Sequence, residues 1–165
     1  MPAMTALTGT GLRWLAVSLL VVVLDQASKW LVLQHLQPYT SMAVLPHFNL
    51  TLTHNYGTAM NIIAEGNRWI LAGLNVVIIG FLIGWLAREP ARFGLLTLGL
   101  ALVIGGAVGN VIDRLRFGYV VDFLHFYWGD WSFYIFNAAD SAITVGVVGI
   151  LLAQFVDHRR DRSQG

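Results

Sequence analysis

The chain has 165 residues, of which 56% are hydrophobic and 12% are charged, and its formal net charge is +1. A soluble domain carries about twice that charged fraction, so the composition indicates a membrane protein. Ten basic residues spread this thinly form no nucleic-acid-binding patch. Cysteine is absent, which excludes a thiol nucleophile, a disulfide framework and a thiolate metal site. We expect one domain over residues 1–165, because half of this length would be too small for a core of its own.

Four stretches are apolar enough to cross a bilayer as helices, which takes about 20 residues each. They are predicted at approximately residues 12–36, 69–87, 93–111 and 138–156. The first opens like a secretory signal peptide, but its apolar run continues past Asp25 and no persuasive cleavage site follows. A retained span is therefore favoured over a cleaved signal. The predicted fold is an all-α polytopic membrane protein with four transmembrane helices.

Arginines favour a cytoplasmic location for both termini. The segments that would share one side of the membrane carry Arg13, Arg88, Arg92, Arg159, Arg160 and Arg162. Cytoplasmic segments are enriched in Lys and Arg. The long loops 37–68 and 112–137 then lie outside, although the second one contains Arg114 and Arg116, which weakens the count.

Both outer loops contain more than linker sequence. The segment FNLTLTH, residues 48–54, alternates apolar and polar side chains, the pattern of a half-buried strand. We therefore predict a small extracytoplasmic β element. The segment YVVDFLHFYWGDWSFYIF is dense in aromatic rings, which prefer the membrane interface. A simple aromatic belt explains the rings but leaves Asp122 among them unexplained.

Polar residues from three of the spans converge on one depth of the membrane. At a rise of about 1.5 Å per residue from the inner arginines, Asp25 lies about 18 Å across, Lys29 about 24 Å, Asn110 about 27 Å and Asp140 about 28 Å. The hydrocarbon core is about 30 Å thick, so these groups meet near its outer boundary. A charge within the bilayer costs at least about 2.5 kcal/mol, so the convergence needs a reason.

Some of these residues also have a purely structural interpretation. Asp25 and Lys29 are four residues apart on one helix face, the spacing of an ion pair. Asn110, at the end of GGAVGN, is compatible with a helix cap, and the small residues before it with close helix packing.

The polar residues nearer the outer boundary of the membrane also have purely structural interpretations. Asp113 and Arg114 are compatible with a surface ion pair that contributes little stability. Asn137 has the position of an N-cap for the fourth helix, and Asp140 would favour the dipole of its first turn.

Two carboxyl groups in a shared site can hydrolyse a peptide bond. The ionised group takes a proton from water, and the protonated group donates one to the carbonyl and then to the leaving nitrogen. Proximity in a low dielectric keeps both from ionising together. Asp122, in the aromatic loop, and Asp140, at the outer end of a span, form the best such pair. The loop between them is long enough to fold back and bring them together.

Other enzyme chemistries fit less well. A Ser/Lys dyad could use Ser28 or Ser141 with Lys29, but Ser28 and Lys29 are adjacent and point apart on a helix, and Ser141 lies on another span. Zinc would need clustered ligands; the histidines are scattered, and only Asp122 with His125 is suggestive.

A proton or ion relay is the main alternative to an enzyme. It could run through Asp25, Lys29 and Asp140. The charges gather towards one face and leave the inner half of the spans apolar, whereas a pathway should cross the full thickness.

Five motifs in order along nearly the whole chain resemble lipoprotein signal peptidase, also called signal peptidase II. They are DQASK with Asp25 and Lys29, NYGTAM with Asn55, Gly57 and Ala59, GNVIDR with Asn110, Asp113 and Arg114, GYVVDF with Asp122, and FNAAD with Asn137, Ala138 and Asp140. One departure is that Met60 and Asn61 follow Ala59, where the family usually has Phe-Ser. Met is a tolerable apolar substitute, so we expect an effect on local packing more than on activity.

The resemblance implies that Asp122 and Asp140 are the catalytic dyad of a membrane aspartyl endopeptidase without metal or cofactor. It implies that the enzyme removes signal peptides from bacterial prolipoproteins by cutting before the diacylglyceryl-modified cysteine. Its partners would be these precursors and the lipid bilayer of the inner membrane, with the site near the outer face, and we expect a monomer. The residues implied to support the site or contact substrate are Asp25, Lys29, Asn55, Gly57, Ala59, Asn110, Asp113, Arg114, Asn137 and Ala138.

Overall fold

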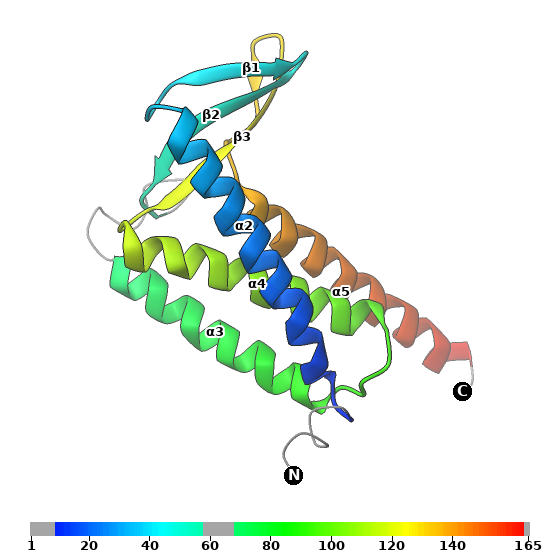
Figure 1. The fold of residues 1–165 in the computed structure, drawn as a ribbon. Helices are drawn as coiled ribbons and strands as arrows, with labels where there is room; N and C mark the ends of the chain where they lie inside the picture. The colour runs from blue at the N-terminus through cyan, green and yellow to red at the C-terminus, as the bar shows by residue number, and fades with distance from the viewer. Residues whose placement is uncertain (1–8, 58–67, 164–165) are drawn as a thin grey trace.

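The computed structural model describes residues 9–57 and 68–163, which form a helical bundle with a small sheet at one end (Figure 1). The helices are η1 (Gly11–Trp14), α2 (Leu15–His35), α3 (Arg68–Arg88), α4 (Leu95–Arg116) and α5 (Ala138–Ser163). The strands are β1 (Ser41–Leu45), β2 (Phe48–Asn55), β3 (Val120–Trp128) and β4 (Trp131–Ser132). Within the described ranges, four helices are long and apolar enough to cross a membrane, so the predicted fold class is confirmed.

Two of the predicted spans end later than expected. Helix α4 continues to Arg116 instead of ending near residue 111, so Asp113 and Arg114 lie on the helix and Asn110 is no helix cap. The apolar run did not reveal this last turn, because its polar Asp113 is satisfied by partners on another helix. Helix α5 continues to Ser163 through polar sequence beyond the apolar span.

Helix α4 is the central helix of the bundle and packs against α2, α3 and α5. About two thirds of its most apolar window is buried, against about a fifth of the corresponding windows of the other three spans. One core cluster joins α3 to α4 through Leu82, Leu86, Leu100, Val103 and Ile104. The other three spans therefore present most of their apolar side chains to lipid.

Small residues set the distance between the helices. A Cβ on Gly99 or on Gly146 would lie 2.7 Å from the carbonyl oxygen of the other, so α4 and α5 touch through their backbones. A Cβ on Gly106 would collide with the carbonyl oxygen of Ala139. The close packing predicted from the small-residue run is confirmed, and it brings the first turn of α5 against α4.

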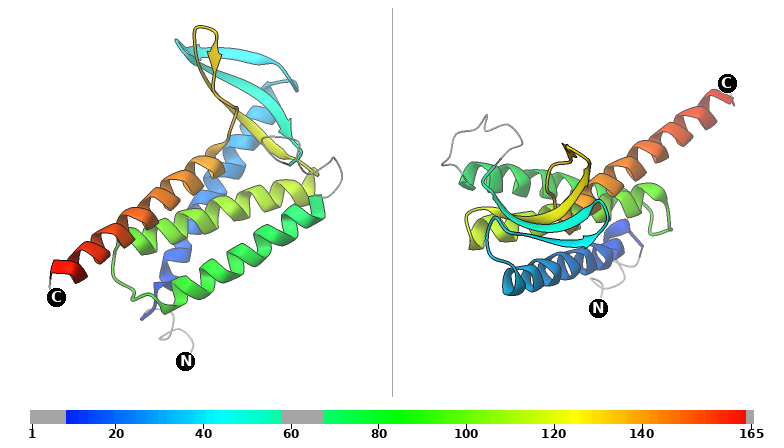
Figure 2. Two further views of the ribbon diagram at one scale, coloured as in Figure 1. Left: turned by 180° about the vertical axis from the view of Figure 1, so that it is seen from behind. Right: turned by 90° about the horizontal axis from the view of Figure 1, so that it is seen from above.

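The four strands form an antiparallel sheet in the order β1-β2-β3-β4. The predicted strand is β2, and the aromatic segment predicted as an interfacial loop forms β3 and β4. Leu52, Val121 and Phe123 pack with Val32 of α2, which fixes the sheet over the end of that helix. The views from behind and above show the sheet covering one end of the bundle, while the C-terminal half of α5 extends away from the other helices (Figure 2).

Candidate active site

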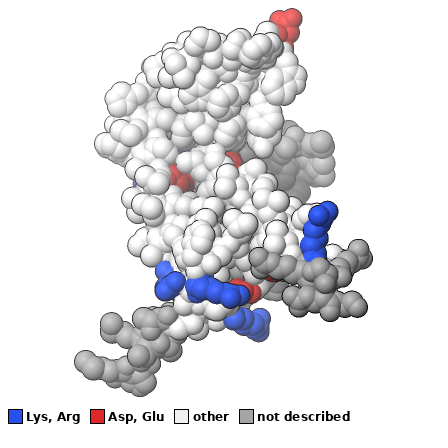
Figure 3. Space-filling model, turned by 90° about the vertical axis from the view of Figure 1, so that its right-hand side faces the viewer, with Lys and Arg blue, Asp and Glu red and all other residues white. Residues whose placement is uncertain are grey.

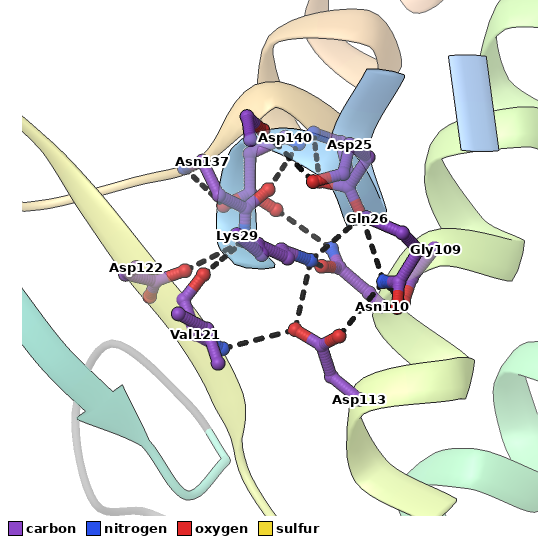
Figure 4. A network of polar contacts seen from close by, with 12 residues as sticks. Asp25, Gln26, Lys29, Gly109, Asn110, Asp113, Val121, Asp122, Asn137 and Asp140 are labelled. Atoms are coloured by element: carbon purple, nitrogen blue, oxygen red, sulfur yellow. Dashed lines mark hydrogen bonds and ion pairs between the residues drawn. The ribbon is translucent and has the colours of Figure 1, made fainter. Parts of the chain in front are cut away.

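Polar side chains from α2, α4, β3 and α5 meet between the bundle and the sheet (Figure 4). The cluster contains Asp25, Gln26, Lys29, Asn110, Asp113, Asp122, Asn137 and Asp140. Residues more than 100 positions apart in the sequence are thereby brought within hydrogen-bond distance. Most members of the cluster are fully buried, so each polar group depends on the others for its partners.

Asp122 lies on β3 and is 2% exposed. Its Oδ1 accepts a hydrogen bond of 2.6 Å from Asn137 Nδ2, and its Oδ2 accepts one of 2.9 Å from Asn55 Nδ2 on the neighbouring strand. Burial raises the pKa of Asp122 to about 7, and the negative charge of Asp140 acts in the same direction, although both amide donors oppose the shift. At neutral pH this carboxyl group therefore exists in both its protonated and its ionised form.

Asp140 lies in the first turn of α5, where the helix dipole favours a negative charge. Its Oδ2 accepts a hydrogen bond from the backbone N–H of Asn137 at 3.2 Å, while Asn137 Oδ1 accepts one from the N–H of Asp140 at 2.9 Å. This reciprocal arrangement is a capping box, and the predicted N-cap role of Asn137 is confirmed. The other carboxylate oxygen, Oδ1, accepts a hydrogen bond from Asn110 Nδ2 at 2.8 Å.

Two asparagines connect the two aspartates. Asn137 contacts Asp122 through its amide group and Asp140 through its backbone. The same amide nitrogen donates to Asn110 Oδ1 at 3.2 Å, and Asn110 in turn donates to Asp140. The two carboxyl groups therefore belong to one hydrogen-bonded unit, in which Asn137 contacts both and Asn110 links Asn137 to Asp140.

Beneath this unit lies a buried ion triad. Lys29 Nζ lies 2.8 Å from Asp25 Oδ2 and 2.8 Å from Asp113 Oδ2, and it also donates to Asn110 Oδ1 at 3.2 Å. The predicted pair of Asp25 and Lys29 is confirmed. The predicted surface pair of Asp113 with Arg114 is wrong, because Asp113 faces α2 and takes Lys29 as its partner.

The triad also holds the backbone beside each aspartate. Asp25 Oδ1 accepts a hydrogen bond of 3.0 Å from the N–H of Ala139, and Asp113 Oδ2 accepts one of 3.0 Å from the N–H of Val121. These N–H groups belong to the residues directly before Asp140 and Asp122. One lysine thus joins two carboxylates, each of which positions one member of the aspartate pair.

Gln26 belongs to the cluster but was not singled out from the sequence. Its Nε2 lies 2.9 Å from Asp113 Oδ1, 3.2 Å from Asp25 Oδ2 and 3.3 Å from the carbonyl oxygen of Gly109. The available signal was its place next to Asp25, as a second polar side chain at the same depth of an apolar span. Gln26 therefore connects the two carboxylates of the triad, Asp25 and Asp113, to the backbone of α4.

The remaining predicted site residues lie around this centre. Asn55 positions Asp122, and its Oδ1 accepts a hydrogen bond of 3.1 Å from the N–H of Gly57. Arg114 is half-buried, donates to the carbonyl oxygen of Asn110 at 3.3 Å, and interacts electrostatically with both aspartates of the pair. Ala138 begins α5. Ala59, Met60 and Asn61 lie outside the described residues.

The weaker chemical alternatives are contradicted by hydrogen bonding. Ser28 donates to the carbonyl of Asp25, and Ser141 to the carbonyl of Asn137, so both hydroxyls are bound to their own helix or its cap. Lys29 is bound between two carboxylates and is no free base. His125 contacts Thr51 and Ser132 instead of Asp122.

The fold and the cluster define a class, namely a multi-pass membrane protein with a buried carboxylate and amide centre at one end of its helices. Residues 17–156 match the family model described as signal peptidase (SPase) II. The chain belongs to the signal peptidase II family and is a peptidase of the bacterial membrane, so the predicted family and enzyme class are confirmed.

Two relatives and one solved structure illustrate the match. The lipoprotein signal peptidase of Tolumonas auensis is 44% identical over 96% of this chain and 99% of its own length. That of Shewanella halifaxensis is 46% identical over 93% of this chain and 92% of its own. A solved structure of a bacterial membrane enzyme superposes with a TM-score of 0.79 at 30% identity, covering 88% of this chain and 89% of that one.

Proposed function

We propose that Asp122 and Asp140 are the catalytic dyad with which this signal peptidase II cleaves its substrate. The reaction of the enzyme is removal of the signal peptide from a bacterial prolipoprotein, and we place the cut just before the diacylglyceryl-modified cysteine. The observation that carries the proposal is that Asn137 contacts both carboxyl groups, one through its amide and one through its backbone. The whole chain acts as one membrane-embedded domain.

The environments of the two aspartates support different roles. Asp140, held by two N–H donors at a helix N-terminus, is the anion that takes a proton from water. The water oxygen attacks the scissile carbonyl carbon while protonated Asp122 donates to the carbonyl oxygen. Asp140 then gives its proton to the leaving nitrogen as the C–N bond breaks, and Asp122 regains a proton from the tetrahedral hydroxyl. The raised pKa of Asp122 suits this alternation at neutral pH.

Two side chains at the edge of the cluster are suited to holding the substrate. The Arg114 guanidinium uses one N–H on the carbonyl of Asn110 and has further N–H groups for a substrate carbonyl. Asn55 ends β2 beyond Thr51, the last β2 residue in register with β1, so an extended peptide could pair with β2 on this side. Gly57 follows it in a tight turn.

The arginines support an orientation with both termini in the cytoplasm. Helix η1, the connection between α3 and α4, and the end of α5 all lie opposite the sheet (Figure 1). On the face shown in Figure 3, Lys and Arg side chains gather at that same end, and the belt above them is almost uncharged. With this end inside, the dyad lies near the outer face, at the depth of lipid-modified precursors.

Cleavage of a lipidated precursor in detergent, with chelator present, tests the dyad. Asp122→Asn and Asp140→Asn should each lower turnover by at least about 1,000-fold, because each removes one of two groups that act as a unit. Asp130→Asn, at an exposed aspartate between β3 and β4, is the matched control and should cleave normally. Near-normal turnover by either dyad variant, with correct insertion, would contradict the proposal.

A further inference from the structure

A recess of about 270 Å³ opens directly beside Asp140. One wall is the aromatic segment that precedes α5, and the other is the first two turns of α5. Its lining consists of Phe133, Tyr134, Phe136, Asp140, Ser141, Thr144 and Val145. The mechanism described above assigns no role to this space.

The recess is largely apolar, although three of its lining residues, Tyr134, Ser141 and Thr144, carry hydroxyl groups. Ser141 Oγ donates to the carbonyl oxygen of Asn137 at 3.0 Å, and Thr144 Oγ1 donates to that of Asp140 at 2.8 Å. The hydroxyls of Ser141 and Thr144 are thus turned onto their own helix and its cap, and most of the remaining wall is made of aromatic rings and aliphatic carbons. Asp140 is the one carboxylate among these lining residues, and it is already oriented by Asn110 and Asn137.

The recess also opens sideways onto the exposed outer surface of the bundle. Val145 is 61% exposed and Tyr134 is 64% exposed, and both belong to surface that no other described element covers. Val145 lies five residues after Asp140, a rise of about 8 Å along the helix. A hydrocarbon chain lying along the exposed apolar side chains of α5 would therefore reach the recess beside Asp140.

We propose that this recess receives the first part of one acyl chain of the diacylglyceryl group on the substrate. The inference rests on the proposed function, since it takes Asp140 to act on the bond next to the lipid-modified cysteine. The lipid is attached to the residue directly after that bond, so it must lie beside Asp140 during the reaction. An apolar space open to the bilayer at this point aligns the cysteine by holding the chain.

The test compares two synthetic lipopeptides that differ only in acyl length, one long and one very short, with wild type and Val145→Trp. The tryptophan fills the recess. The wild type should show a kcat/KM for the long-chain substrate at least about fivefold above that for the short one, since the longer chain buries more apolar surface. Val145→Trp should lose this preference and keep its short-chain kcat/KM within about twofold of wild type.

Leu152→Trp is the matched control, because it adds the same ring to an exposed position of α5 two turns further along. It should retain the wild-type preference. Phe133→Ala, which enlarges the recess, should lower the long-chain kcat/KM alone and gives an independent second variant.

The possible results distinguish a failure of the recess proposal from a failure of the dyad proposal. If Asp140→Asn cleaves either lipopeptide normally, the proposed function fails. If Asp140→Asn is inactive but Val145→Trp and Phe133→Ala keep the wild-type chain-length preference, the recess proposal alone is overturned. A change in preference for a peptide side chain near the cleavage site, with unchanged chain-length preference, would assign the recess to the peptide and also overturn it.

Discussion

The ammonium group of Lys29 lies 2.8 Å from Asp113 Oδ2, which joins α2 to α4 at a fully buried position. Asp25 is the second carboxylate at the same distance from this ammonium group. Two buried carboxylates therefore share one cation, and the backbone beside each aspartate of the proposed dyad is hydrogen-bonded to one of them. The stability of the bundle and the geometry of the dyad consequently depend on the same charge.

Lys29→Met should destabilise the protein by about 3–5 kcal/mol, because it leaves two buried carboxylates without their cation. Unfolding in detergent by increasing denaturant measures this loss. Combining Lys29→Met with Asp113→Asn should recover part of the stability, since one of the unpaired charges is removed. A Lys29→Met variant as stable as the wild type would show that the triad is not ionised as described.

The raised pKa of Asp122 predicts how stability changes with pH. The folded state holds this proton up to about pH 7, whereas the unfolded state releases it near 3.8. Asp122 therefore stabilises the fold fully below that lower value, and the contribution is lost as the pH rises through about 7. Between the two values the free energy of unfolding should fall with a slope of at most about 1.4 kcal/mol per pH unit.

Measuring the free energy of unfolding from pH 4 to 8 in wild type and Asp122→Asn checks this slope. The asparagine variant should lack the contribution and gain stability over wild type towards the upper end of the range. Identical pH profiles for the two proteins would mean that the carboxyl group has its ordinary pKa in the fold.

Asn137 offers a way to separate helix capping from the reaction. Asn137→Ser keeps an oxygen that can accept from the N–H of Asp140, but it removes the amide donor to Asp122. We expect Asn137→Ser to be about 1 kcal/mol more stable than Asn137→Ala, because only the first retains a capping side chain. Both variants should lose most of their activity, and a highly active serine variant would contradict the orienting role of the amide.

A substitution at Gly109 tests whether the position of the Asp25 carboxylate is essential to the site. A Cβ at this position would lie 2.5 Å from Asp25 Oδ2, so Gly109→Ala must displace that carboxylate. We expect a cost of about 1–3 kcal/mol and a loss of peptidase activity. Gly84→Ala on α3 is the control, since its Cβ meets no atom within 4 Å and the change should be neutral or slightly stabilising.

The depth of the polar groups could be predicted from the sequence because a charge in a bilayer needs a partner. Counting depth along each helix predicted a cluster that includes Asp25, Lys29, Asn110 and Asp140. The structure brings these four residues together. The period-two pattern of β2 was equally informative. Both features are local or depend only on distance along a helix.

The pairing of individual side chains could not be predicted in this way. Asp113 takes Lys29 and not its neighbour Arg114, because the rotation of α4 is set by backbone contacts at glycines such as Gly106. Gln26 was missed for the same reason, since two of its three partners, Asp113 and Gly109, lie on α4. The strand character of β3 was hidden by its many aromatic residues, which are equally typical of an interfacial belt.

The span of sequence that separates Asn55 from Asp122 has a consequence for biosynthesis. Their hydrogen bond closes a loop of 67 residues that contains α3 and α4, and Asp140 follows on α5. A partly synthesised chain holds neither the β2–β3 pairing nor the capping box that orients Asp140. We therefore expect the proposed aspartate pair to assemble only after α5 has been synthesised and packed against α4.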